Sequence, residues 1–428
     1  MAHPPPEARP ELRRELGKWD LTAIGVNQVI GAAIFAMPGT LAAQIGGWSW
    51  IAVAAVAVMA MMVALNFAEA ASRFDRTGGA YLYTRAAFGR FPSFQVGWML
   101  FVTRATSWAS VINALADALG YYWPDFRAGA LRATLITGVI IAITIINVRG
   151  VKQSAYVVNF LTLAKLTPLA VFIVLGLPHV SADALRPETT LTLTQVSATA
   201  LLLIFAFGGY EVIPVPAGEA RDPKRAVPFA MIATIIIVAI VMTLVQITAL
   251  GTFPGLAASK TPLADASALF MGAWGALLMT AGAAVSMTGN NVGQALSGSR
   301  NLFALAEQGD LPGVFGHVHP KFRTPDFAIV FIASVALALA LLSDFRSLAA
   351  VSALARLVVY AGTCASVLAL RRQGPAPFTI PLGPTVPVLA LLISIALAYG
   401  ANELQFKVGA AFLLAGAVLY LVARRRSR

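Results

Sequence analysis

Residues 25–39 read GVNQVIGAAIFAMPG, an apolar run that glycine and proline interrupt. Residues 205–216 read FAFGGYEVIPVP and are interrupted in the same way. Because glycine lacks a side chain and proline lacks an N–H group, both residues favour a break in a membrane-spanning helix. Corresponding broken spans in two halves of a chain indicate a transporter binding site near the middle of a bilayer. In both stretches a glycine precedes a proline by seven residues, namely Gly31 to Pro38 and Gly209 to Pro216.

The whole chain has the composition of a membrane protein. Of its 428 residues 58% are hydrophobic and 12% are charged, whereas soluble domains are about 25% charged. Continuous apolar runs predict spanning helices of about 20 residues rather than the alternating strands of a β-barrel. We therefore predict an all-α integral membrane protein with one membrane domain and about twelve spans. The predicted spans cover residues 21–43, 49–71, 94–121, 133–148, 155–177, 195–215, 229–251, 266–298, 328–342, 348–370, 386–401 and 408–422.

The net charge of +12 is explained by the orientation of the chain in the membrane. Lys and Arg are concentrated in the tails and loops on the side of the N-terminus, for example in residues 73–90, 221–225 and 424–428, and are sparse in the opposite loops. The positive-inside rule then predicts cytoplasmic N- and C-termini in the inner (plasma) membrane. Residues 1–18 contain four prolines and no apolar core, so they indicate a cytoplasmic tail rather than a signal peptide. The partners we expect are bilayer lipid and a small substrate, not nucleic acid. No obligatory protein partner is indicated, and a homo-oligomer stays open.

Other stretches carry a resemblance to a known family. They are TGGAYLY (77–83), FGGYE (207–211), GEARDPKR (218–225) and SRNLFALAEQGDLP (299–312). With the first broken span, they resemble the amino acid–polyamine–organocation (APC) superfamily of permeases over essentially the whole chain. One departure is Ala33, which stands where many members have a glycine.

The resemblance implies an architecture and an activity. The fold would be a LeuT-type five-plus-five inverted repeat with broken helices 1 and 6 and two extra helices. The activity would be secondary active transport of amino acids by alternating access. This architecture divides the chain into a tail (1–18), a first repeat (19–177), a second repeat (194–370) and helices 11 and 12 (383–423).

The backbone at the two breaks is the predicted substrate site. Free N–H groups at Ala32 and Ala33 would form the positive end of a half-helix and attract a carboxylate. Unpaired carbonyl groups near Val29, Phe205 and Gly208 would accept an ammonium group. A zwitterionic amino acid fits this pair of sites, whereas the alternative interpretation is a tight helix crossing through the two glycines. The predicted substrate-binding residues are Val29, Gly31, Ala32, Ala33, Phe205, Gly208 and Gly209.

Two ionisable residues in the spans are candidates for coupling. Lys165 is predicted near the midplane, where a charge costs roughly 2.5–3.5 kcal/mol. In the family that this sequence resembles, a lysine at this point can occupy the place of a sodium ion, so we predict the proton as coupling ion and no other cofactor. The alternative is a permanently charged brace on the carbonyls of the first helix. Glu211 would either relay a proton or, as we favour, cap exposed N–H groups after the second break.

Other polar groups in the spans are interpreted as structural. Arg104 and Arg356 need partners, for which we predict Asp117 or backbone carbonyls. Gly289 and Gly293 form a G-x-x-x-G pattern that favours close helix packing. Ser286, Asn290 and Asn291 lie on the same predicted span, but its helical phase leaves their direction open.

Other classes of protein fit the sequence poorly. The four histidines, His3, His179, His317 and His319, fall in predicted tails or loops, so no intramembrane Ser–His pair, haem or zinc site is predicted. No phosphate-binding G-x-x-x-x-G-K-[ST] motif is present. We therefore expect neither an intramembrane enzyme nor a metal site. The function we predict is a proton-coupled amino acid symporter, with a sodium-independent amino acid or polyamine exchanger as the alternative.

Overall fold

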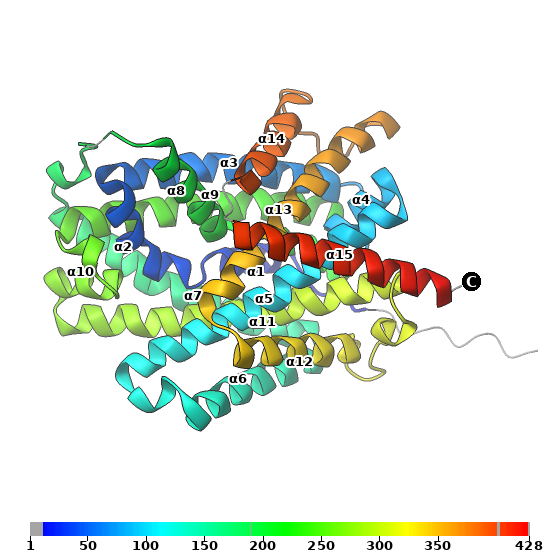
Figure 1. Ribbon diagram of the computed structural model, residues 1–428, viewed down its shortest axis with the longest axis horizontal. Coiled ribbons are helices and arrows are strands. Elements are labelled where there is room, and N and C mark those ends of the chain that lie inside the picture. The colour runs from blue at the N-terminus through cyan, green and yellow to red at the C-terminus, as the bar shows by residue number, and fades with distance from the viewer. Residues whose placement is uncertain (1–11, 189, 400–402, 427–428) are drawn as a thin grey trace, which may run out of the picture.

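Long helices run side by side along the long axis of the molecule (Figure 1). The computed structural model describes residues 12–188, 190–399 and 403–426, so residues 1–11 of the predicted tail lie outside it. In the described residues the elements are helices and connecting segments, with one isolated bridge between Leu16 and Ala220. The longer helices are α1 (Lys18–Val29), α2 (Ala33–Ile45), α3 (Ser49–Ala71), α4 (Ala80–Phe88), α5 (Arg90–Tyr122), α6 (Gly129–Arg149), α7 (Val151–Gly176), α8 (Leu193–Phe207), α9 (Pro223–Thr252), α10 (Pro262–Met271), α11 (Ala273–Glu307), α12 (Asp326–Leu342), α13 (Phe345–Leu370), α14 (Thr385–Tyr399) and α15 (Glu403–Arg426).

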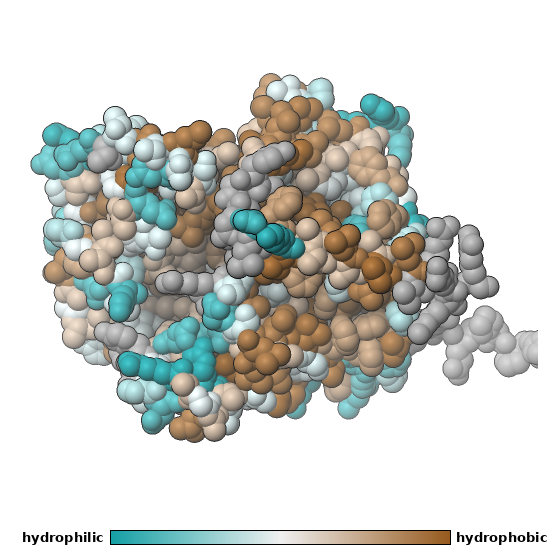
Figure 2. Space-filling model, viewed as in Figure 1, coloured by the Kyte–Doolittle hydropathy of each residue, from teal (hydrophilic) through white to brown (hydrophobic). Residues whose placement is uncertain are grey.

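The fold has the inside-out polarity of a protein in lipid. Within the described residues, six segments are long and apolar enough to cross a membrane, and further apolar helices are shorter. Apolar residues cover much of the visible face over α12, α13 and α15 (Figure 2). Large apolar side chains such as Phe160 and Leu163 are 70% and 69% exposed, while Arg104 and Lys165 are fully buried. Outward apolar and inward charged side chains are what a bilayer requires.

Helices lie on all twelve predicted spans, but one prediction was wrong. Segment 266–298, expected as a single span, contains parts of two helices, α10 and α11. They separate at Gly272, whose φ of +64° is a conformation that glycine adopts without steric cost. Both sides of this turn are apolar, so hydropathy does not reveal it.

Both predicted helix breaks are present. Helix α1 ends at Val29 and α2 begins at Ala33. Helix α8 ends at Phe207, after which Gly209 has a φ of +133°.

The chain beyond the second break differs from our expectation of a second half-helix. It forms the short 3₁₀ turns Tyr210–Val212 (η5) and Ala217–Glu219 (η6). Pro214 and Pro216 lie between these turns and cannot donate the hydrogen bonds of an α-helix.

Glycines bring the broken segments and α11 into close contact. A Cβ atom on Gly209 would lie 2.6 Å from the carbonyl oxygen of Gln28, so the second break packs directly on the backbone of α1. A Cβ atom on Gly289 would lie 2.6 Å from the side chain of Asn27, and one on Gly293 would lie 2.2 Å from the side chain of Gln28. The packing role predicted for the G-x-x-x-G pattern is therefore confirmed.

Buried ion pairs hold one end of the bundle together. Arg300 of α11 donates to both carboxylate oxygens of Glu219, each at 3.0 Å, and both side chains are fully buried. The carbonyl oxygen of Glu219 accepts the N–H of Leu16 at 2.9 Å, which ties the segment before α1 to η6. Nearby, Tyr81 donates to Asp310 at 2.6 Å, and burial together with this bond raises the pKa of the Tyr81 phenol.

The first prediction concerns this end of the bundle. We expect Glu219→Gln to destabilise the protein by about 3–5 kcal/mol, because Arg300 would remain buried without its counter-charge. Asp183→Asn is the matched control, since Asp183 pairs with Arg186 at the surface and both are largely exposed. Thermal unfolding in detergent measures both changes. Equal melting temperatures for the two variants would contradict the prediction.

Candidate functional site

A small cavity lies where the two broken segments meet. Its volume is about 30 Å³. Six of the seven predicted substrate-binding residues line it, namely Val29, Gly31, Ala32, Ala33, Phe205 and Gly208. The seventh, Gly209, is not part of the lining and packs on the backbone of α1 instead. Further lining residues are Gln28, Ser107, Val111, Ala206, Asn290, Gln294 and Arg356.

The N-terminus of α2 opens on this cavity. Ala32 is its N-cap residue, and no side chain caps this end of the helix in the described part of the chain. The first N–H groups of a helix lack partners within the helix and carry a partial positive charge. This end of α2 therefore presents donors suited to a carboxylate.

The carbonyl groups at the end of α1 are already bonded, contrary to our expectation for Val29. Its carbonyl oxygen accepts the N–H of Gly31 at 2.9 Å. At the other break the carbonyl of Phe205 accepts the N–H of Gly208 at 3.1 Å. Each bond closes a tight turn of two or three residues, and each oxygen keeps a second lone pair. An additional acceptor is the buried Oε1 atom of Gln28, which has no partner in the described residues.

Lys165 of α7 binds the end of α1. Its Nζ atom donates to the carbonyl oxygens of Asn27 at 3.0 Å, Ile30 at 2.7 Å and Ser286 at 3.2 Å. A cation at the C-terminus of a helix is stabilised by the helix dipole. The ammonium group therefore joins α7, α1 and α11 beside the first break, with the contacts that the brace interpretation expects.

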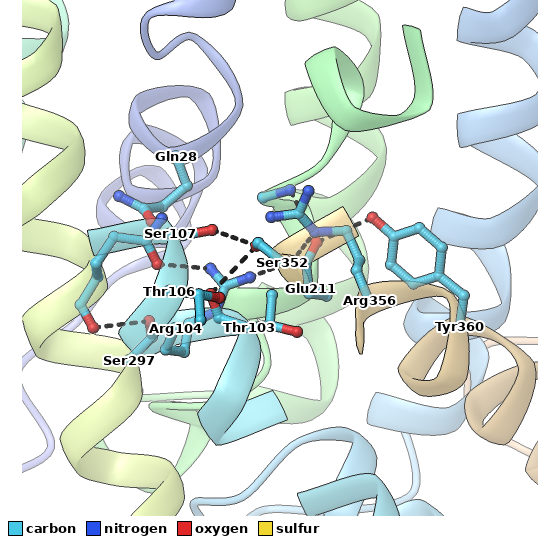
Figure 3. Close-up of polar contacts among 12 residues, drawn as sticks. Gln28, Thr103, Arg104, Thr106, Ser107, Glu211, Ser297, Ser352, Arg356 and Tyr360 are labelled. Carbon is cyan, nitrogen blue, oxygen red and sulfur yellow. Dashed lines mark hydrogen bonds and ion pairs between the residues drawn. The ribbon is translucent and has the colours of Figure 1, made fainter. Parts of the chain in front are cut away.

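Glu211 is the centre of a buried ionic cluster just after the second break (Figure 3). Its Oε1 atom accepts hydrogen bonds from Arg104 of α5 and, at 2.7 Å, from Nε of Arg356 of α13. Its Oε2 atom accepts the N–H of Gly209 at 2.8 Å and the hydroxyl of Tyr360 at 3.1 Å. The carboxylate thus accepts a backbone N–H at the break itself, not those of a following half-helix, and also pairs with two guanidinium groups.

The partner predicted for the two arginines was wrong. Asp117 pairs instead with Arg132, at 2.7 Å. Asp117 is 60% exposed near the end of α5, whereas both arginines are deeply buried. The turn at the second break directs Glu211 toward α5 and α13, a consequence of local backbone geometry that spacing does not reveal.

A chain of hydrogen bonds connects the two breaks. Arg104 donates to Oε1 of Gln294 at 3.0 Å, and Nε2 of Gln294 donates to Oδ1 of Asn290 at 3.2 Å. Asn290 then donates to the carbonyl oxygen of Gln28 at 2.8 Å. Polar contacts therefore link the Glu211 cluster to the end of α1.

Sequence reasoning missed part of this lining. Ser107 and Gln294 gave no signal, because isolated polar residues are common in spans. Arg356 did give one, since a charge deep in a span marks a functional candidate, yet we interpreted it only as a link between helices. Of the two adjacent asparagines, Asn290 lines the cavity and Asn291 does not.

A bundle of apolar helices with two broken spans around a small cavity is typical of membrane transporters. Comparison with known sequences agrees, because residues 16–422 match the family model described as amino acid permease. The chain belongs to this amino acid permease family.

Its relatives cover nearly the full length. An uncharacterized transporter of Mycobacterium tuberculosis is 31% identical over 98% of this chain and 94% of the relative. The branched-chain amino acid permease of Bacillus subtilis is 27% identical over 97% of this chain and 94% of its own length. The serine/threonine exchanger of the same organism is 27% identical over 89% of each chain.

Proposed function

We propose that this protein moves amino acids across the cytoplasmic membrane by alternating access. One observation carries the proposal: the two helix breaks meet at a single buried cavity that has N–H donors on one side and oxygen acceptors on another. The α-carboxylate binds at the N-terminus of α2. The α-ammonium group binds the free Oε1 atom of Gln28 and the remaining lone pairs of the carbonyls of Val29 and Phe205. The named substrates of the permease and exchanger relatives support this class of ligand.

The proposed orientation follows from the distribution of charge. Lys and Arg are concentrated at the end of the bundle that carries α4 and the last turns of α15, which we place in the cytoplasm. The Glu219–Arg300 pair then closes the cytoplasmic side of the transport path.

For coupling we propose the proton, with Lys165 as the group that carries it. Its ammonium binds the carbonyls at the end of α1, so loss of its proton removes the positive charge and one of the three N–H donors that hold this end of the helix to α7. Release of α1 would open the cavity toward the cytoplasm. The second candidate is sodium-independent exchange, which the serine/threonine exchanger relative favours. In that case Lys165 stays charged and only holds the helices together.

Uptake into proteoliposomes tests the function itself. We expect purified protein to accumulate at least one labelled amino acid and to release it in exchange for an excess of the same compound. A thermal-shift screen against amino acids, polyamines and organic cations identifies the compound to label, since a ligand at 100 times its Kd adds about 2.7 kcal/mol of stability. Neither stabilisation nor uptake for any amino acid would refute the proposal.

A further inference from the structure

Arg356 has an unused donor that faces the substrate cavity. Its Nε atom binds Glu211, but its Nη1 atom is buried and has no partner among the described residues. The residue is 3% exposed and lines the cavity, and Figure 3 shows its side chain beside Glu211. A buried donor of a charged group without a partner is costly. It therefore indicates a ligand that accepts a hydrogen bond at this point.

The backbone is shaped to keep this guanidinium group in place. A Cβ atom on Gly208 would lie 2.1 Å from Nη1 of Arg356. The missing side chain at Gly208 thus leaves the space that the guanidinium group occupies. The ring of Phe205 lies 5.8 Å from Cζ of Arg356 and supports the group by a cation–π contact.

The charges around the cavity do not balance. Arg104 and Arg356 share the single carboxylate of Glu211, which leaves one excess positive charge in the cluster. The other buried carboxylates in the described part of the chain have cations of their own: Glu69 pairs with Arg371, Glu219 with Arg300, and Asp310 with Arg85 and Arg90.

We propose that the substrate is an acidic amino acid whose side-chain carboxylate binds Nη1 of Arg356. This inference rests on the proposed function, which places the α-carboxylate at the N-terminus of α2. A neutral side chain would leave the positive cluster uncompensated in a low-dielectric site. A second carboxylate supplies both the missing acceptor and the missing charge. Arg356 is therefore the residue that determines specificity.

Isosteric substrate pairs separate charge from shape. Aspartate and asparagine have nearly the same size, as do glutamate and glutamine. We expect wild-type protein in proteoliposomes to bind the acidic member of one pair about tenfold more tightly than its amide, because a charge-assisted hydrogen bond is exchanged for a neutral one. Competition against a labelled substrate measures the ratio.

Variants then test whether Arg356 causes this preference for the acid over the amide. Arg356→Gln should bring it to about one while binding of the amide persists. Gly208→Ala keeps every charge but displaces the guanidinium group, so it should lower the ratio as well. Arg186→Gln is the control, because Arg186 is an exposed arginine and the ratio should not change. If Arg356→Gln does not fold, the wild-type ratio and the ratio in Gly208→Ala still test the acidic preference.

The outcomes distinguish this inference from the proposed function. Binding of neutral amino acids as tight as or tighter than that of acidic ones would overturn the acidic preference and leave amino acid transport in place. Equal loss of acid and amide binding in Arg356→Gln, with an unchanged ratio in Gly208→Ala, would also overturn it. Failure to bind any amino acid would refute the proposed function and this inference together.

Discussion

Replacement of Glu211 by glutamine is expected to destabilise the protein by about 3–5 kcal/mol and to abolish transport. The change keeps the shape of the side chain but removes the anion between Arg104 and Arg356. Two buried guanidinium groups would then repel each other, and breaking a buried pair has this cost because a charge remains without compensation. The melting temperature of the purified variant and its uptake in proteoliposomes measure the two effects.

A control and a rescue make this prediction specific. Glu403→Gln removes the carboxylate of an exposed pair with Lys407 and should change stability by less than about 1 kcal/mol. The double variant Glu211→Gln, Arg104→Met removes one of the two cations and should recover part of the lost stability. Wild-type stability of the single variant would show that the cluster is not held by charge.

Lys165→Ala is expected to eliminate gradient-driven accumulation while exchange persists. The alanine cannot carry a proton or bind the carbonyls of Asn27 and Ile30, so the end of α1 would no longer respond to protonation. Uptake is measured in sodium-free liposomes with and without an inward proton gradient. Lys260→Ala, a change at an exposed loop lysine, should behave as wild type.

The alternatives give different results in the same assay. If Lys165 is only a brace, wild-type uptake responds weakly to the gradient and the alanine variant loses exchange and stability together. A sodium requirement in wild-type protein would contradict both the coupling and the brace interpretations.

The sequence predicts the breaks well because their cause is local. Glycine and proline change the backbone wherever they occur, so Gly31 and Gly209 mark the interruptions without any tertiary information. The lining by Val29, Gly31, Ala32 and Ala33 follows from the same local reasoning. Hydropathy likewise finds the spans, since the bilayer imposes one length and one polarity on each of them.

The polar side of the site could not be predicted because it depends on helix rotation and long-range contacts. Arg104, Glu211 and Arg356 come from three segments that are far apart in the chain, and their meeting depends on how α5 and α13 pack around the second break. Asp117 was a reasonable partner by spacing, yet it lies near the end of α5, where Arg132 is closer. Neighbouring residues of a helix point in different directions, so Asn290 lines the cavity and Asn291 does not.

The central claim is that an amino acid binds in the cavity between the two breaks. Equilibrium binding of the labelled substrate to wild type, Gly31→Val and Gly138→Val tests it most directly. A side chain on Gly31 would project toward Asn290, 3.1 Å away, into the cavity, whereas one on Gly138 of α6 would meet nothing within 4 Å. Gly31 is a better target than Gly209, where a side chain would collide with the backbone of α1 and disturb folding. We predict that Gly31→Val remains folded and monodisperse but loses binding, and that Gly138→Val binds as wild type. Normal affinity in folded Gly31→Val would contradict the account and show that the first break serves only helix packing.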